Sequence, residues 1–340
     1  MRRPFLLISP YATVCRVNKS FWKKLKKPFF VLAPMANVTD AAFRSIISKY
    51  GKPDVMWTEF VSADGLVSEG KKKLLADLKY SEDERPIVAQ LFSANPERME
   101  EAARLVVMLG FDGLDINMGC PDKAIVKQGA GGALIKNPKL AVEIIEAARR
   151  GVAGKIPISV KTRIGYSKDE LENWLPILLK TEVVAVTIHA RTVKEMSKVP
   201  ARWQHIKNAV KIRNRLKCHT LIIGNGDVPS LEDGMKLVKE TGADGIMIGR
   251  GIFGNPFLFN KKSLKNSAHL KMKLKILVEH TLLFEKMSKG AKRFDVMKKH
   301  FKAYVSGFDG AKELRATLMQ TKNAKEVKKV VGDYWLAKKN

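Results

Sequence analysis

Short apolar runs rich in β-branched residues recur eight times along the chain from Pro28 onward, and segments with helical periodicity lie between them. Runs of this length predict buried strands. The periodic segments predict helices, most clearly at 96–109 and 138–149. Both helices begin with a proline directly after an asparagine, a pair typical of an N-cap followed by the first helical residue. The eight runs are 29–32, 55–58, 87–91, 113–117, 158–161, 184–188, 221–223 and 246–248.

Eight strands that each precede a crossover constrain the fold strongly. A (β/α)8 barrel consists of eight parallel strands, each followed by a helix, in about 250 residues. A doubly wound α/β sheet is the alternative, but it rarely uses eight such units. The sequence therefore predicts a (β/α)8 TIM barrel over 28–260.

The segments on either side of the predicted barrel differ from it. After 260 the strand pattern stops, and 261–340 has the pattern of basic helices with breaks at Gly290, 307–310 and Gly332. This predicts a small, all-helical C-terminal domain. Residues 1–27 contain no acid and predict a basic N-terminal extension. A transit peptide is the alternative, but prolines interrupt the apolar stretch that it would need.

The net charge of +28 is concentrated in these two flanks. Residues 1–27 contain eight Lys and Arg, and 261–340 contain 21 against seven Asp and Glu, whereas 28–260 is nearly balanced. Such asymmetry favours a polyanionic partner. Nucleic acid is favoured over an anionic membrane because the basic segments lack a long, uninterrupted amphipathic helix suited to a membrane surface. No apolar stretch approaches the roughly 20 residues that a spanning helix needs. Three scattered cysteines predict neither a disulfide framework nor a metal site, and they indicate a reducing, cytoplasmic location.

Polar residues cluster directly after the predicted strands. In a barrel the carboxyl ends of all strands lie on the face that holds the active site, so these residues should meet there. The loops after the seventh and eighth strands are rich in glycine and contain Arg250, which is typical of phosphate sites in barrels. Gly249, Gly251 and Gly254 also spell a dinucleotide fingerprint. No acidic residue of a βαβ unit follows them, so we reject that interpretation.

A flavin mononucleotide suits this set of residues. Lys161 and His189 provide a cation and a hydrogen-bond donor for an electron-rich heterocycle. Gln90 could bond a ring edge, and Pro34 and Met35 could lie against a flat face. Each residue taken singly is more often an ordinary loop or capping residue, so the prediction depends on the whole set.

In chain order the strand ends carry the motifs VLAPMANVTDAAFR, TEF, AQLF, DINMGCP, VKTRIG, IHART, GNGDV and IMIGRG. Together these motifs resemble those of the tRNA-dihydrouridine synthases. The resemblance covers 28–260 and reaches the tail through KKHFKAY at 298–304. It implies an FMN-dependent barrel with a C-terminal helical domain that binds tRNA. The implied activity is the reduction of uridines in tRNA, with NADPH or NADH as reductant.

The resemblance also assigns a role to each matching residue. Asn117 would approach the flavin and the uracil edge, Arg163 and Arg191 would fix the substrate, and Cys120 would be the general acid. We expect a monomer with no metal site and no membrane segment. The residues that would contact or hold FMN are Pro34, Met35, Ala36, Gln90, Lys161, His189, Asn225, Gly226, Asp227, Gly249 and Arg250.

The chemistry of uracil reduction supports the role of Cys120. Reduction of the C5–C6 bond needs a hydride from FMN N5 at C6 and a proton at C5 from an acid that is protonated near neutral pH. A thiol with a pKa of about 8.5 meets that need. Gly119 and Pro121 would fix its loop, and the glycines within 129–132 would let the returning chain approach closely. A buried structural cysteine is the alternative.

Two departures from the family pattern affect the expected substrate contacts. Ser197 and Val199 stand where the family usually has a Tyr-x-Gly element, and Ala303 stands where a tryptophan often precedes the tyrosine. Two other functions compete with a tRNA-dihydrouridine synthase. An FMN barrel oxidoreductase acting on a small dihydropyrimidine-like molecule leaves the basic tail without a role. A non-catalytic tRNA-binding protein leaves Cys120 and the flavin set without one.

Overall fold

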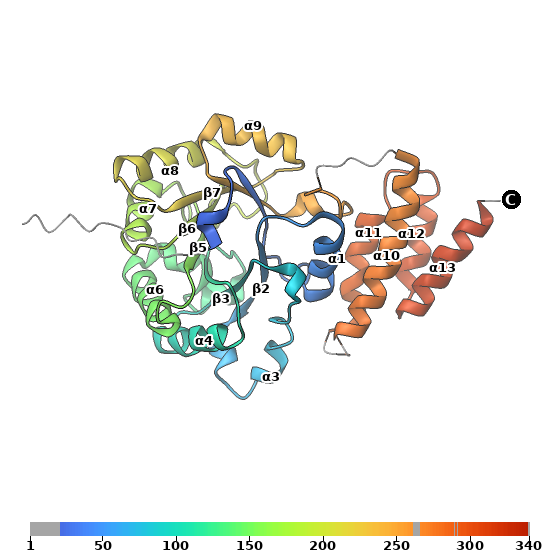
Figure 1. Cartoon of the computed structure of the whole chain (residues 1–340), viewed down its shortest axis with the longest axis horizontal. Helices are drawn as coiled ribbons and strands as arrows, with labels where there is room; N and C mark the ends of the chain where they lie inside the picture. Colours follow the sequence, from blue (N-terminus) through green and yellow to red (C-terminus); the bar gives the residue numbers. More distant parts are fainter. Residues whose placement is uncertain (1–20, 261–265, 289, 291, 339–340) are drawn as a thin grey trace, which may run out of the picture.

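Eight parallel strands form one closed sheet in the larger part of the molecule (Figure 1). The computed structural model describes residues 21–260, 266–288, 290 and 292–338. The strand order is β1-β8-β7-β6-β5-β4-β3-β2, and the sheet closes where Leu32 N donates to Val55 O at 3.2 Å. The strands are β1 (Phe29–Leu32), β2 (Met56–Ser62), β3 (Ile87–Phe92), β4 (Gly113–Met118), β5 (Ile158–Arg163), β6 (Ala185–His189), β7 (Leu221–Asn225) and β8 (Gly245–Ile248).

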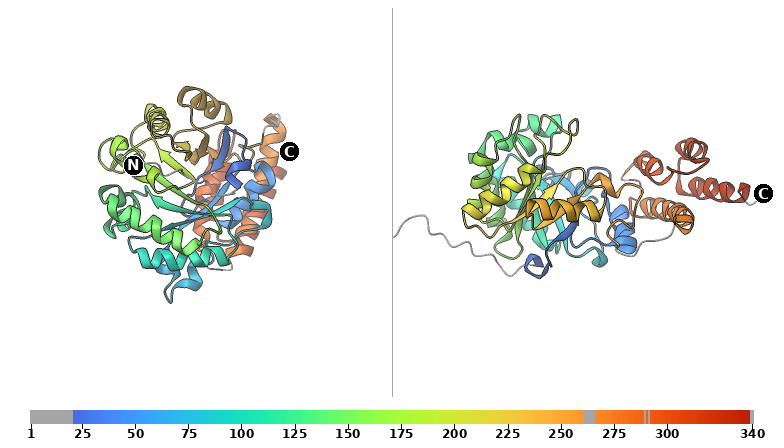
Figure 2. Two further views of the ribbon diagram at one scale, coloured as in Figure 1. Left: turned by 60° about the vertical axis from the view of Figure 1, so that its left-hand side comes forward. Right: turned by 90° about the horizontal axis from the view of Figure 1, so that it is seen from above.

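Helices surround the sheet, so the predicted (β/α)8 barrel is confirmed (Figure 2). The two helices that the sequence predicts most clearly are α4 (Pro96–Met108) and α6 (Pro138–Val152). Asn95 Oδ1 accepts the N–H of Arg98 at 2.9 Å, and Asn137 caps α6 in the same way. The other helices around the barrel are α1 (Ala41–Gly51), α2 (Ala63–Leu66), α3 (Lys71–Leu74), α5 (Lys123–Lys127), α7 (Leu171–Lys180), α8 (Gln204–Arg215) and α9 (Leu231–Thr241).

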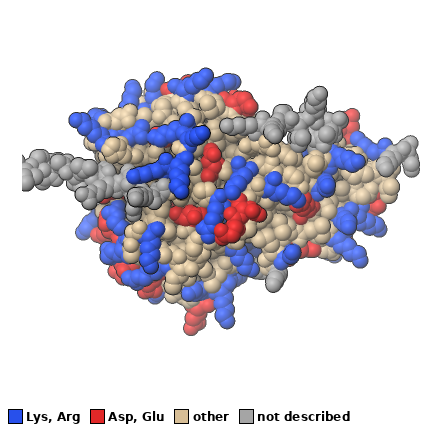
Figure 3. Space-filling model, viewed as in Figure 1, with Lys and Arg blue, Asp and Glu red and all other residues tan. Residues whose placement is uncertain are grey.

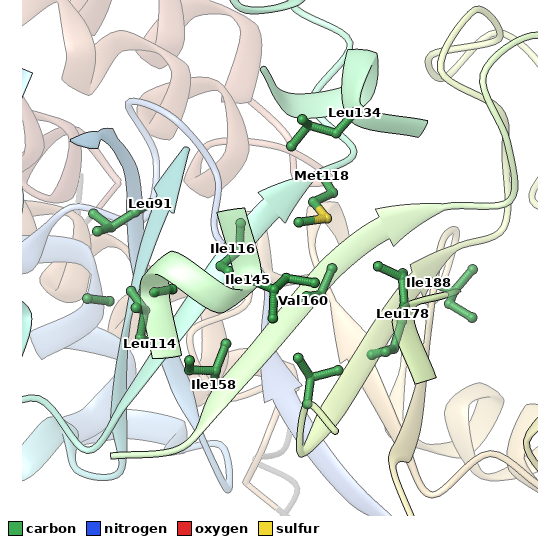
Figure 4. Packing of buried hydrophobic residues seen from close by; sticks show 14 of the residues in the cluster. Leu91, Leu114, Ile116, Met118, Leu134, Ile145, Ile158, Val160, Leu178 and Ile188 are labelled. Carbon is green, nitrogen blue, oxygen red and sulfur yellow. The ribbon is translucent and has the colours of Figure 1, made fainter. Parts of the chain in front are cut away.

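Alternation along the strands divides the barrel core into two layers. Leu114 and Ile116 of β4 point outward and pack with Ile145 of α6 between the sheet and the helices (Figure 4). Trp57 and Met247 belong to a separate cluster, to which positions on β1, β2, β3, β6, β7 and β8 contribute. Several inward positions nearer the carboxyl ends of the strands are polar instead. The candidate site therefore lies at that end of the barrel interior.

The segment before β1 packs onto the amino-terminal end of the barrel. The short 3-10 helix η1 (Phe21–Lys24) carries Trp22, which is buried against Trp57 with ring centroids 5.9 Å apart. Residues 1–20 of the predicted N-terminal extension lie outside the described residues. The boundary at residue 28 stays a prediction.

Among the described residues, four α-helices form a second body beside the barrel, here called the helical region (Figure 1). Leu277, Phe301 and Leu318 belong to its hydrophobic core, which Ala42 and Ile46 of α1 join. The helical region is therefore joined to the barrel through α1. A core separate from that of the barrel supports the predicted domain division at 260, which stays a prediction. The helices are α10 (Asn266–Ser288), α11 (Lys298–Tyr304), α12 (Ala311–Gln320) and α13 (Ala324–Ala337).

The predicted breaks in this region are only partly right. Gly290 and 307–310 lie between helices, but Gly332 lies inside α13, so the break predicted there is wrong. Val327 and Val331 of α13 are buried. Burial of such a face outweighs the roughly 0.5–1 kcal/mol by which glycine disfavours a helix relative to alanine. Within the described part of the chain, no helix combines the length and apolar character needed to cross a membrane.

Candidate active site

The carboxyl ends of the strands surround a pocket of about 710 Å³ at the mouth of the barrel. The predicted site residues meet there, and all of them except Ala36 line its wall. Ala36 is exposed and lies outside the wall, so its predicted contact with a flavin stays a prediction. The predicted residues in the wall are Pro34, Met35, Gln90, Asn117, Cys120, Lys161, Arg163, His189, Arg191, Asn225, Gly226, Asp227, Gly249 and Arg250.

Sequence reasoning misses several wall residues. Phe60 reaches the wall after a register shift in β2 between Trp57 and Phe60, which breaks the alternation that sequence arguments assume. Ser197, noted only as a departure from the family pattern, lies in the loop after β6, and no local signal marks it. Gly119 and Pro121, expected only to fix the cysteine loop, also line the pocket. The remaining unpredicted wall residues are Ala33, Val228, Pro229, Met247 and Gly251.

Hydrogen bonds hold the loop that carries Cys120. Asn117 Oδ1 accepts the N–H of Gly119 at 3.1 Å and that of Cys120 at 2.9 Å. The carbonyl of Cys120 accepts the N–H of Gly132 at 3.0 Å. A Cβ at Gly132 would lie 2.7 Å from Val193 and 3.0 Å from the Cys120 carbonyl. Only glycine therefore lets the returning chain come this close, as the sequence predicts.

Arg163, at the end of β5, ties two loops together. Its Nε donates to the carbonyl of Gly119 at 2.8 Å, and its Nη1 donates to the carbonyls of Thr192 and Met196, each at 2.9 Å. The side chain is buried. Through these bonds the guanidinium fixes the part of the pocket wall that carries Cys120. The predicted direct contact of Arg163 with the substrate stays a prediction.

The Cys120 thiol is protonated at neutral pH. Burial raises its pKa above the ordinary value. This effect outweighs the backbone hydrogen bond from Asp122 and the charges of Arg163 and Lys161, which lower the pKa. A protonated thiol in the wall of the pocket can donate a proton to a group bound there.

Lys161 of β5 brings a positive charge into the pocket wall and reaches across to β7. Its Nζ donates to Asn225 Oδ1 at 3.2 Å, and Asn225 Nδ2 donates to the carbonyl of Met247 at 2.8 Å. Burial, reinforced by the charge of Arg163, lowers the pKa of Lys161 to about 8. Lys161 is therefore mostly charged at pH 7 and loses its charge in mildly alkaline solution.

His189 of β6 stays neutral. Burial, reinforced by Lys161 and Arg163, holds the pKa of His189 far below its ordinary value. Arg191 Nη1 lies 3.0 Å from His189 Nε2. Because arginine can only donate, Nε2 accepts and the ring proton is on Nδ1. Arg191 also forms an ion pair with Asp227, and Arg250 Nη2 donates to the same carboxylate at 2.8 Å.

The wall of the pocket carries an excess of positive charge. Lys161 and three arginines line it, and Asp227 is the only carboxylate among the described residues that do so. Both oxygens of Asp227 are already bonded to arginines. Gly226 beside it has a φ of 128°, a conformation that residues with a side chain rarely adopt. This arrangement suits an anionic group such as a phosphate, held close to the backbone at the ends of β7 and β8.

Comparison with known protein families gives one match over almost the whole barrel and the helical region. The family described as "Dihydrouridine synthase (Dus)" matches residues 31–338. "Probable tRNA-dihydrouridine synthase 2" of Bacillus subtilis (strain 168) is 43% identical over 321 residues, which cover 94% of this chain and 97% of that protein. "Probable tRNA-dihydrouridine synthase" of Staphylococcus aureus (strain COL) is 40% identical over the same length, with 94% and 96% covered.

Similar solved structures support the fold. Histamine dehydrogenase from Rhizobium sp. 4-9 superposes with a TM-score of 0.54 at 14% sequence identity and covers 75% of this chain. A 2-naphthoyl-CoA reductase complex superposes with a TM-score of 0.51, also at 14% identity, and covers 68%. The chain spans about half the length of each, 48% and 49%. At this identity the similarity supports the barrel fold alone.

Proposed function

Because the chain belongs to the dihydrouridine synthase family and is an oxidoreductase, we propose that it reduces uridines of tRNA with a flavin held in the pocket. Two parts of the pocket meet different needs of this reaction. The wall made by β7, β8 and Lys161 would hold the flavin. The wall made by the Cys120 loop and the loops after β5 and β6 would hold the uracil.

The flavin side of the pocket fits FMN. The excess of cationic side chains suits its phosphate, and the glycines after β7 and β8 let the backbone approach it. Lys161 and Gln90 offer N–H donors for a heterocycle, and Pro34 and Met35 offer a flat apolar surface. When bound, the flavin would supply the hydride for uracil C6, with NADPH or NADH as the source of reducing equivalents.

Cys120 would supply the proton. The observation that carries this proposal is that a half-buried, protonated thiol lies in the wall of the same pocket as the flavin set. Asn117 fixes the backbone of Cys120, and Arg163 fixes the carbonyl of the preceding residue. The thiol proton would pass to uracil C5, and the site would recover it from solvent.

The basic flanks would hold the tRNA. A uridine inside folded RNA must leave its stack to reach the mouth of a barrel, so the rest of the RNA needs other contacts. Lys and Arg side chains are spread over both bodies on the face in Figure 3. We propose that 261–340 is a tRNA-binding domain, that 1–27 adds contacts with phosphates, and that the protein works as a cytoplasmic monomer.

The direct test uses an in vitro tRNA transcript, which carries no modified bases. The purified protein is incubated with FMN, NADPH and the transcript, and the digested RNA is analysed by mass spectrometry. We expect dihydrouridine at specific positions, and no product when FMN is left out. Uridine monophosphate and a free dihydropyrimidine serve as small-molecule controls. Turnover of these but not of tRNA would favour the small-molecule oxidoreductase, and tRNA binding without product would favour the non-catalytic alternative.

A further inference from the structure

Asp115 is a buried carboxylate inside the barrel, one layer below the pocket. Leu114, Ile116 and Met118 of β4 point outward into the core between sheet and helices, so Asp115 and Asn117 point inward. Asp115 is fully buried and does not line the pocket. The proposed mechanism gives it no role.

We infer that Asp115 is a positioning residue: it fixes the direction of a chain of side-chain amides that ends on the backbone of Cys120. This inference rests on the proposed role of Cys120 as proton donor. It assigns to Asp115 no contact with substrate or cofactor.

The chain of hydrogen bonds runs across three neighbouring strands. Gln90, Asp115 and Ser159 are register partners on β3, β4 and β5, so their side chains share one layer of the barrel. Gln90 Nε2 donates to Asp115 Oδ2 at 2.6 Å, and Ser159 Oγ donates to Oδ1 at 2.5 Å. One layer higher, Asn117 Nδ2 donates to Gln90 Oε1 at 3.0 Å. Asn117 Oδ1 then accepts the N–H groups of Gly119 and Cys120.

The chemistry of the two ends allows only one direction. A carboxylate can only accept, so Gln90 must present its NH₂ group to Asp115 and its oxygen to Asn117. Backbone N–H groups can only donate, so Asn117 must present its oxygen to Cys120 and its NH₂ group to Gln90. Both ends impose the same direction, and each amide is satisfied at both of its ends. Without an acceptor at 115, the N–H that Gln90 gives to Asp115 would be buried without a partner.

A carboxylate at this place is costly, which argues for a function. Burial raises the pKa of Asp115 to about 6, although the bonds from Ser159 and Gln90 and the charge of Lys161 all lower it. A hydrophobic residue would avoid this cost of burying a charge. Natural proteins accept such local costs mainly at functional sites.

The competing explanation is that Asp115 only balances the charge of Lys161. Two substitutions separate direction from charge. Asp115→Asn removes the charge but keeps an acceptor for Gln90, because its own NH₂ group can donate to the Ser159 hydroxyl. Asp115→Leu removes both the charge and the acceptor. If the direction of the hydrogen bonds through Gln90 and Asn117 matters, Asp115→Asn should behave like the wild type and Asp115→Leu should not.

The experiment uses the full chain loaded with FMN, after FMN content and thermal unfolding have been checked for each variant. Three rates are measured: flavin reduction by NADPH, flavin reoxidation by tRNA, and alkylation of Cys120 by iodoacetamide followed by peptide mass mapping. For Asp115→Leu we expect reoxidation by tRNA to slow by roughly 10- to 100-fold, as misplacement of a reacting group does. Alkylation should become faster because the loop loosens, and reduction by NADPH should stay within about threefold of the wild-type rate. Asp115→Asn should stay near wild type in all three.

A second pair of variants keeps the inference testable if Asp115→Leu does not fold. Ser159→Ala leaves Asp115 as the acceptor for Gln90 and should reoxidise normally. In Asp115→Asn combined with Ser159→Ala, the NH₂ group of the introduced asparagine has no acceptor at 159. Nothing then holds the oxygen of that asparagine toward Gln90, so reoxidation by tRNA should slow. In a Cys120→Ala background none of these changes should slow reoxidation further.

Three results would overturn the inference. The first is that Asp115→Asn and Asp115→Leu slow reoxidation by tRNA equally. The second is that Asp115→Leu and the Asp115→Asn/Ser159→Ala combination both reoxidise at the wild-type rate. The third is that these changes slow reoxidation further in the Cys120→Ala background. If the wild-type protein itself is not reoxidised by tRNA, the proposed function fails. The alkylation rates still test the positioning role in that case, because alkylation needs neither tRNA nor reductant.

Discussion

Asp115 and Lys161 carry charges of opposite sign on neighbouring strands, Asp115 fully buried and Lys161 half-buried. Burial moves the pKa values of both residues toward neutrality. The pKa of Asp115 rises to about 6 and that of Lys161 falls to about 8. At pH 7 both residues are therefore mostly charged. A fall in pH of about one unit would half-neutralise Asp115, and a rise of about one unit would half-neutralise Lys161. This gives the site two titrations with opposite consequences.

The titration of Asp115 predicts a pH-dependent effect of Asp115→Asn on stability. The pKa of Asp115 in the folded protein lies above its unfolded value of 3.8, so its ionisation lowers stability as pH rises from about 4 to about 6. The asparagine has no such titration. As pH rises over this range, we expect the free energy of unfolding of the variant to increase relative to that of the wild type, by on the order of 3 kcal/mol at most. Urea unfolding at pH 4.5 and pH 7 measures this difference. Parallel pH profiles would contradict the assignment.

The titration of Lys161 predicts a pH-dependent affinity for FMN. As pH rises through about 8, Lys161 loses its charge, and the attraction for the anionic cofactor weakens. We expect the affinity of the apoprotein for FMN to fall by roughly three- to tenfold between pH 7 and pH 9. Lys161→Met should bind more weakly at pH 7 and vary little with pH. Fluorescence titration measures both proteins, and the same pH dependence in the variant would assign the titration to another group.

The pocket residues could be predicted because they lie directly after apolar runs, and a barrel brings all such positions to one face. Asp115 could not be predicted in the same way. Its function depends on Gln90 and Ser159, and the register of three strands, rather than any local pattern, makes these residues its partners. Phe60 was hidden for a related reason, since a register shift in β2 changes which side chains face the mouth.

The eight strands of the sheet and the N-caps of α4 and α6 could be predicted from local chemistry alone. The break predicted at Gly332 fails because tertiary burial of Val327 and Val331 outweighs the low helix propensity of one glycine. Local signals therefore place elements well where propensity and packing agree, and they fail where the two compete.

Gly332 and Gly307 give a matched pair of variants for this explanation. A Cβ at either position would meet nothing within 4 Å, so space does not separate them. Gly332 is helical, and Gly332→Ala should stabilise the protein by about 0.5–1 kcal/mol. Gly307 has a φ of 78°, and Gly307→Ala should destabilise it by roughly 1–2 kcal/mol. Thermal unfolding measures both effects. A loss of stability in Gly332→Ala would contradict this explanation and would show that the fold requires glycine at this position of α13.

The helical region is not independent of the barrel. Ala42 and Ile46 of α1 complete its core, so removal of 261–340 would expose apolar surface on the barrel. Its proposed role in RNA binding is therefore better tested by removing charges than by truncation. Lys325, Lys328 and Lys329 lie exposed along α13, and none of them forms an ion pair with another described residue.

Replacement of these three lysines by glutamine should weaken tRNA binding and reduce its dependence on salt. Each lost phosphate contact lowers the slope of log K against log salt concentration by about 0.7 to 0.9. We expect the slope to fall by roughly 1 to 2. Lys207, Lys211 and Lys217, on or just after α8, provide a control with the same change of net charge. Equal effects of both triple variants would mean that only net charge matters, and would contradict a specific role for α13.

We propose that Cys120 delivers the proton to a uridine of tRNA, and this role can be tested by measuring the two half-reactions of Cys120→Ala separately. The variant should bind FMN, and NADPH should bleach its flavin at the wild-type rate, because that step involves no uracil. Reoxidation by tRNA, followed by flavin absorbance under anaerobic conditions, should slow by roughly 10²- to 10⁴-fold, as expected for the loss of a general acid. Cys218→Ala serves as the control and should leave both rates unchanged. If Cys120→Ala is reoxidised by tRNA at the wild-type rate, Cys120 is a packing residue and the proton comes from another group.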